Sequence, residues 1–447
     1  MSQDQPPART RSDVKFKLSL MMFLQYAIWG AWLPILYPFL LGYRGFSLSQ
    51  TGLCLSAGAV GAIFGPFIAG QLADRLFSTE RLLAVSHLVG AVLVLLLATV
   101  EGFMPILLIS GVYGFVYAPT LSLTNSISFA HIADRDRDFG PIRLWGTIGW
   151  IVAGILVGQY LLRFATPSEG TPTDITAAQD AGRAVAFYIS SALGFVMAVF
   201  CLFLPHTPPS GTDSAAEGRQ LAWLEAFKEI RIQPLLTLFL IAVPVSMIHQ
   251  FYFVFTSDFV TGIQNTAQSE GADAFAGFVN QIFGVGGGGL MTIGQMSEIL
   301  VLALIPFFAR SVGRKWLLLI GLAAYAGRMA IFAYAPTLIP VLFGVALHGL
   351  CFGCFIFVAF MVVDEHTTPD VRATAQNLFN LVIVGIGIIV GSYFATGVVG
   401  AWAKMPAADG GGMDYAKLFS VPMWMSVACL ALMLVFYPRH SRPLAAA

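Results

Sequence analysis

Three ionisable side chains lie deep within apolar segments in the second half of the sequence. Counted from the nearest polar loop at 1.5 Å per residue, Glu298, Arg328 and His348 each come to a depth of roughly 20 Å, near the middle of a bilayer. Such groups usually serve a solute or proton pathway. A carboxylate, a guanidinium and an imidazole in one layer fit a proton relay, with Glu298 and His348 as carriers, or an ion-paired clamp for a substrate. The alternative is a structural Glu298–Arg328 pair that locks two neighbouring helices, and for Arg328 the sequence favours it.

Two further stretches place polar or aromatic groups on one helix face. Gln295 stands three residues before Glu298, so the two side chains suit a joint grip on neighbouring hydroxyls of a solute. Gln25, Trp29 and Trp32 recur at helical spacing and predict a second stripe. Its indoles either stack on a planar solute or pack the bundle, and packing is the commoner role of a membrane tryptophan.

Arg143 stands at the start of another apolar segment, 140–162, a few residues after the charged run 134–138. An arginine just inside a membrane helix either faces a polar solute pathway or extends its side chain to the headgroups. Its position alone leaves both interpretations open.

The composition explains why these charges need a membrane setting. Hydrophobic residues make up 57% of the 447 residues and charged residues only 11%, against roughly 25% charged in a soluble domain. This predicts an integral membrane protein. The net charge of zero gives no indication of a nucleic-acid partner. The five cysteines lie in apolar segments, and no metal-ligand cluster, nucleophile–base set or nucleotide loop is evident, so we expect no metal, no cofactor and no enzymatic activity.

Hydropathy predicts twelve membrane helices, each needing roughly 20 apolar residues. The predicted spans are 16–41, 49–73, 82–100, 104–128, 140–162, 185–204, 233–258, 287–309, 315–334, 338–362, 373–398 and 419–437. A polar segment, 205–231, separates six spans from six. The sequence therefore predicts an N-terminal half, 1–204, a linker, 205–231, and a C-terminal half, 232–447, as in transporters with two pseudo-symmetric halves.

The positive charges predict the orientation. Most of the 24 Lys and Arg residues fall on the loops that lie on the same side as the N-terminus. Because such loops usually stay in the cytoplasm, both termini and the linker are expected there. The polar, basic N-terminus is not followed by a signal-peptide pattern, so we expect it to be a retained tail.

The loop after the second span carries a short charged motif. Its sequence, 70–81, resembles the G-x-x-x-D-R loop signature of the major facilitator superfamily. Asp74 is placed to cap or pair with a helix end, and Arg75 to hold the loop at the inner surface. For both residues a gating or structural role is more probable than a role in substrate binding.

Several longer strings resemble the bacterial nucleoside:proton symporters of the same superfamily. They are 25–32, 119–128, 141–149, 295–298 with 305–308, and 372–376, and the resemblance extends over nearly the full length. It implies an all-α protein of twelve membrane helices in two six-helix halves. It also implies proton-driven uptake of nucleosides through the bacterial inner membrane, by a chain we expect to be a monomer in the lipid bilayer.

The resemblance also implies a binding site. Its base- and ribose-contacting positions fall on Arg143, Thr147, Gln250, Gln295, Glu298 and Phe352. At three other positions of that site this chain differs from the family. Trp150 replaces another aromatic residue, Phe253 an asparagine and His348 a tyrosine.

The largest departure from the family is Gly353, which stands where the resemblance expects an aspartate central to proton coupling. Asp364 and Glu365 lie at a helix end and cannot replace it without a shift of register. Three interpretations follow: coupling through Glu298 with His348, uniport down a gradient, or a changed substrate such as a sugar. A solute receptor that does not transport is the alternative from a different functional class.

Overall fold

The computed structural model describes residues 10–209, 225–269, 274–308, 311–368, 371–406 and 412–438. Within them it contains twelve helical segments long and apolar enough to cross a membrane, which confirms the predicted fold class. The first six are built from α1 (Ser12–Trp32), η1 (Leu33–Ile35), α2 (Leu36–Pro38), η2 (Phe39–Tyr43), α3 (Leu48–Arg75), α4 (Thr79–Thr99), α5 (Phe103–His131), α6 (Arg135–Phe164), α7 (Pro172–Gly182) and α8 (Ala184–Cys201).

The second six begin after the segment 210–224, which is outside the described residues. They are built from α10 (Leu235–Ser269), α11 (Ala274–Phe283), α12 (Gly288–Phe308), α13 (Arg314–Tyr334), α14 (Leu338–Ala346), α15 (His348–Leu350), η3 (Cys351–Phe357), α16 (Val358–Glu365), α17 (Arg372–Asn380), η4 (Leu381–Gly387), α18 (Ile388–Tyr393), η5 (Phe394–Gly400), α19 (Ala401–Ala403) and α20 (Tyr415–Phe436). The segments η3, η4 and η5 are π-helical, and π-helical turns are frequent at functional sites.

Hydropathy missed two helices and placed the end of a third too early. The helix α7 precedes the predicted sixth span, α10 runs to Ser269 instead of 258, and α11 was not predicted. The start of α7 is fixed by polar chemistry, because the side chain of Thr171 accepts from the backbone of Asp174 and that of Asp174 accepts from Thr171. Polar residues in α7 and late in α10 conceal these helical turns from a search for apolar runs.

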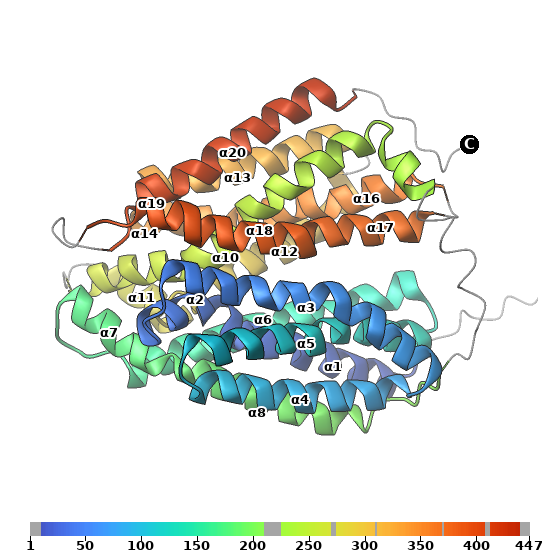
Figure 1. Cartoon of the computed structure of the whole chain (residues 1–447), viewed down its shortest axis with the longest axis horizontal. Helices are drawn as coiled ribbons and strands as arrows, with labels where there is room; N and C mark the ends of the chain where they lie inside the picture. The colour runs from blue at the N-terminus through green and yellow to red at the C-terminus, as the bar shows by residue number, and fades with distance from the viewer. Residues whose placement is uncertain are drawn as a thin grey trace, which may run out of the picture.

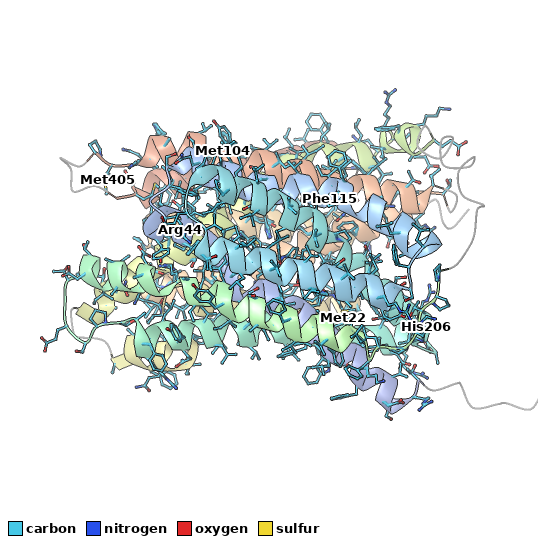
Figure 2. All side chains as sticks on the ribbon, turned by 60° about the horizontal axis from the view of Figure 1, so that its bottom comes forward. Met22, Arg44, Met104, Phe115, His206 and Met405 are labelled. Carbon is cyan, nitrogen blue, oxygen red and sulfur yellow. The ribbon has the colours of Figure 1, made fainter. Side chains whose placement is uncertain are left out.

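The helices form two layers, α1 to α8 in one and α10 to α20 in the other (Figure 1). Two separate apolar cores correspond closely to these layers, one built almost wholly before residue 205 and the other almost wholly after residue 234. The outer faces of the helices are also apolar, as the exposed side chains of Met104 and Phe115 illustrate (Figure 2). Such a surface is typical of a protein surrounded by lipid.

The two layers, called here the N-half and the C-half, are tied together at one end of the bundle. We call the end at which α1 begins and α8 and α20 finish the terminal end, and the other the opposite end. At the opposite end the backbone amide of Val285 donates to the carbonyl of Gly158 at 3.0 Å, and the side-chain Nε2 of Gln159 donates to the backbone carbonyl of Gln281 at 2.8 Å. A side chain at Gly158 or Gly284 would overlap the facing backbone, so both glycines permit this close approach.

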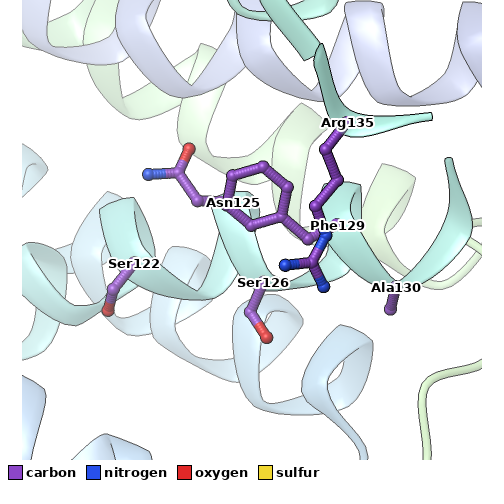
Figure 3. Close-up of a pocket in the computed structure, with 6 residues that line it drawn as sticks. All are labelled: Ser122, Asn125, Ser126, Phe129, Ala130 and Arg135. Atoms are coloured by element: carbon purple, nitrogen blue, oxygen red, sulfur yellow. The ribbon is translucent and has the colours of Figure 1, made fainter. Parts of the chain in front are cut away.

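The terminal end carries an open pocket of about 450 Å³ on the N-half (Figure 3). It is lined by Ser122, Asn125, Ser126, Phe129, Ala130 and Arg135. These residues come from the last turns of α5 and the start of α6, and none of them belongs to the predicted binding site. Ser122 and Ser126 are exposed although they lie within a membrane span, which indicates that this face of α5 meets water.

Candidate functional site

His348 is the centre of an aromatic stack inside the C-half. Its ring lies 4.8 Å from the ring of Tyr252 and 5.4 Å from that of His249, with interplanar angles of 19° and 29°. Phe352 continues the stack at 6.5 Å, and the ring of Phe253 meets His348 edge-on at 6.0 Å. The helix α10 thus supplies three of the rings that hold the imidazole in place.

Arg328 reaches the same imidazole from α13. The guanidinium is fully buried, with Nη1 3.2 Å from Nδ1 of His348 and Cζ 4.2 Å from the ring centre of Tyr252. Its Nε and Nη2 atoms have no hydrogen-bond partner in the described part of the protein. Such a face of an arginine can hold two acceptors at once.

Glu298 faces the other nitrogen of His348. Its Oε2 atom lies 3.8 Å from Nε2 of His348, and its side chain is half-buried. The expected Glu298–Arg328 ion pair is therefore wrong, since no such pair within 4.0 Å occurs between these two described residues and His348 stands between them. Depth along the helices was predicted correctly, but depth does not fix which way a side chain turns.

The helix α12 is fitted closely against this cluster. Ser297 accepts a hydrogen bond from the backbone of Gly349 at 3.0 Å, and a side chain at Gly294 would touch His348 and the hydroxyl of Tyr252. Gln295, one turn before Glu298, is buried, and its Oε1 atom has no partner among the described residues. It is therefore available to a ligand.

Arg143 contributes a charge from the N-half. Its Cζ atom lies 4.0 Å from the ring centre of Tyr26, and Gly146 leaves the space that this stacking requires. Arg143, Tyr26 and Glu298 interact electrostatically, which brings the N-half arginine and the C-half carboxylate to the same region. Thr147 is half-buried on the same helix.

The other predicted site residues are more firmly tied into the packing. Gln250 is buried and accepts a hydrogen bond from Ser392 at 3.3 Å. Trp150 lies where α6 crosses α1, since a side chain at Gly30 would touch it. Whether Trp150 and Gln250 contact a solute remains a prediction. The side chains of Asp74 and Arg75 lie outside the described residues, so the gating role stays a prediction too.

Gly353 faces apolar neighbours. A Cβ atom there would lie 2.7 Å from Cγ1 of Val301 and 3.2 Å from Cδ1 of Ile305, so a larger side chain needs these two side chains of α12 to move. The two acids downstream are occupied at the terminal end: Asp364 accepts from Gln376 at 2.9 Å, and Glu365 from Arg314 at 2.6 Å. Neither restores a carboxylate at the position of Gly353.

The polar and aromatic stripe of α1 has a structural role. The side chain of Gln25 donates to the hydroxyl of Thr120 at 2.7 Å and accepts from Nε2 of His87 at 2.9 Å. Its backbone carbonyl accepts from the hydroxyl of Tyr117, on whose ring Trp29 packs at 4.9 Å. Every polar group of this glutamine side chain is therefore satisfied within the N-half.

Sequence reasoning missed His249, Tyr252, Tyr325 and Tyr26. His249 is bonded to the hydroxyl of Tyr325 at 2.7 Å, and the two belong to the aromatic cluster around His348. A signal was present, because His249 is adjacent to the predicted Gln250 and Tyr26 lies within a family-like string. No group of three or more His, Cys, Asp or Glu side chains that could hold a metal occurs in the described ranges.

These features together define a multi-pass transporter of the major facilitator fold, with a buried polar layer between two halves. The chain belongs to the family described as Nucleoside H+ symporter, whose pattern it matches over residues 12–442. It is 34% identical over 385 residues to a putative nucleoside transporter of Escherichia coli, YegT, covering 84% of this chain and 82% of that protein.

Two further relatives cover nearly the whole chain. The nucleoside permease NupG of Escherichia coli is 27% identical over 442 residues, 96% of this chain and 97% of that protein, and the xanthosine permease of the same organism is 26% identical over 423 residues, 93% of this chain and 91% of that protein. The crystal structure of NupG superposes with a TM-score of 0.77 at 26% identity, covering 96% of this chain and all of that one.

Proposed function

We propose that this protein carries nucleosides through the bacterial inner membrane by alternating access and leaves them chemically unchanged. The observation that carries the proposal is a polar layer in which Arg143 of the N-half interacts electrostatically with Glu298 of the C-half, and Glu298 in turn faces His348. Gln295 adds an unpartnered acceptor one turn away. The family and its relatives support a nucleoside as the substrate of this layer.

The proposed cycle begins from a state that is closed at the opposite end. Hydrogen bonds between Val285 and Gly158 and between Gln159 and Gln281 support this assignment, as does the open pocket at the terminal end. By the distribution of Lys and Arg, the terminal end and both chain termini face the cytoplasm. The working unit is proposed to be a single chain in the lipid bilayer.

Proton coupling is proposed to use Glu298. It is the only predicted carboxylate of the layer, and the family's aspartate position is Gly353, packed against Val301. Entry of a proton would neutralise Glu298 while the two halves rock against each other. His348 would supply a polar contact to the Glu298 side chain. Uniport is the second candidate function, favoured by the same glycine.

Counterflow in proteoliposomes tests the proposal. Vesicles loaded with unlabelled uridine should accumulate labelled uridine transiently, and external adenosine should compete while glucose should not. Competition by the sugar instead would indicate a different hydroxylated solute. Saturable uridine binding without counterflow would indicate a receptor and would contradict transport.

A further inference from the structure

The contact between Arg328 and His348 decides where the imidazole carries its hydrogen. A guanidinium has five N–H donors and no acceptor, so the nitrogen that it contacts must accept. That nitrogen is Nδ1 of His348, 3.2 Å from Nη1 of Arg328. A neutral imidazole with an accepting Nδ1 carries its hydrogen on Nε2, and Nε2 is the nitrogen that faces Glu298.

We propose that Arg328 is a positioning residue that holds His348 in the neutral Nε2–H form, so that His348 presents an N–H donor to Glu298 and does not itself carry the transported proton. This inference rests on the proposed function and assigns the proton to Glu298 alone. At 3.8 Å the Nε2 and Oε2 atoms face each other without a formed hydrogen bond, and rotation of the carboxylate closes this gap.

The surroundings of His348 reinforce this assignment. The titratable and charged groups that face it are Glu298 from α12, Arg328 from α13, and His249 and Tyr252 from α10. Tyr325 of α13 and Cys351 of η3 interact with Arg328. The helix α14 contributes no titratable side chain.

Protonation of His348 would have two costs in this setting. It would place a hydrogen on Nδ1 and break the bond from Arg328, and it would set two cations side by side in a buried region. Once Glu298 has itself taken up a proton, no carboxylate among the described residues lies within 4.0 Å of Arg328 or His348 to offset the second charge. The stacked rings of Tyr252 and His249 also prevent the imidazole from turning away.

Nitrogen NMR of the purified protein tests the tautomer without any need for transport. In protein labelled with ¹⁵N-histidine, the signals of His348 are identified by their loss in His348→Gln, because the chain contains seven histidines. We expect Nδ1 to stay without hydrogen and Nε2 to stay hydrogen-bearing from pH 5 to 8. Arg328→Lys, which keeps a donor and the charge, should preserve this pattern. Arg328→Met removes the donor to Nδ1, so a hydrogen should appear on Nδ1 in part of the molecules.

Transport assays supply the second arm. The side chain in His348→Gln keeps an N–H donor near the position of Nε2 but cannot take up a proton, whereas that in His348→Leu keeps neither property. We expect proton-driven uridine accumulation in His348→Gln to exceed that in His348→Leu by about tenfold or more. Titration of His348 in the wild type, or loss of coupling in His348→Gln with counterflow retained, would overturn the proposal. If no nucleoside is transported by any variant, the proposed function fails, while the NMR result still decides the tautomer.

Discussion

Two buried glutamines, Gln25 of the N-half and Gln295 of the C-half, differ in whether the described part of the protein gives their side chains partners. In the N-half the side-chain nitrogen and oxygen of Gln25 each have a partner, Thr120 and His87 respectively. In the C-half Gln295 has an acceptor without a partner, and Arg328 has two donor nitrogens without one in the described structure.

This difference separates a structural polar cluster from a site for a ligand. A buried polar group left without a partner costs about 1–3 kcal/mol, which a ligand that hydrogen-bonds to the group would offset. The N-half cluster holds α1, α4 and α5 together. The C-half cluster is proposed to meet the substrate together with Arg143, whose charge acts on Glu298.

The largest expected effect comes from removing the carboxylate of the C-half. Glu298→Gln should abolish uridine accumulation driven by a pH gradient and preserve counterflow, because the amide cannot exchange a proton. Both assays use the same proteoliposomes, so a folding defect would depress both. Accumulation that survives in Glu298→Gln would show that coupling lies elsewhere, and absence of accumulation in the wild type would favour uniport.

Arg143→Lys should come next in size. Lysine keeps the charge but loses the planar group that lies over Tyr26, so uridine transport should fall about tenfold or more. Arg163→Lys is the matched control, because Arg163 is exposed at the other end of the same helix. Wild-type transport by Arg143→Lys would make Arg143 a headgroup anchor.

Gln25→Leu should affect stability rather than transport. It leaves Thr120 and His87 without their partner, and thermal unfolding in detergent should show a loss of about 1–3 kcal/mol. Transport per folded molecule should stay near the wild-type value. A normal melting temperature combined with lost uridine binding would reverse the roles assigned to the two glutamines.

Gly353→Ala should have the smallest effect on coupling. The added methyl group meets Val301, and a shift of this flexible contact should cost about 1–3 kcal/mol of stability. The pH dependence of transport should be unchanged, because no titrating group is gained or lost. A Gly353→Ala variant with altered pH dependence would show that this position still takes part in coupling.

The sequence predicted the twelve spans and placed the three ionisable residues in one layer, because hydropathy and helical rise depend only on the residues of a single segment. It could not predict the partner of Arg328, since depth gives one coordinate and the direction of a side chain depends on how helices pack. The structure places His348 between Arg328 and Glu298, an arrangement that depth alone does not indicate. The helix α7 was missed because its Thr171–Asp174 cap and polar turns carry no hydropathy signal. His249 was missed because its role depends on Tyr325, which is distant in sequence.

The most direct test of the central claim is equilibrium binding of labelled uridine to three purified proteins: the wild type, Gln295→Ala and Gln25→Ala. If the unpartnered C-half glutamine grips the nucleoside, Gln295→Ala should weaken binding by roughly 1–3 kcal/mol, or about 5- to 150-fold. Gln25→Ala should bind as the wild type does once corrected for the folded fraction. Unchanged affinity in Gln295→Ala together with weakened affinity in folded Gln25→Ala would contradict the account.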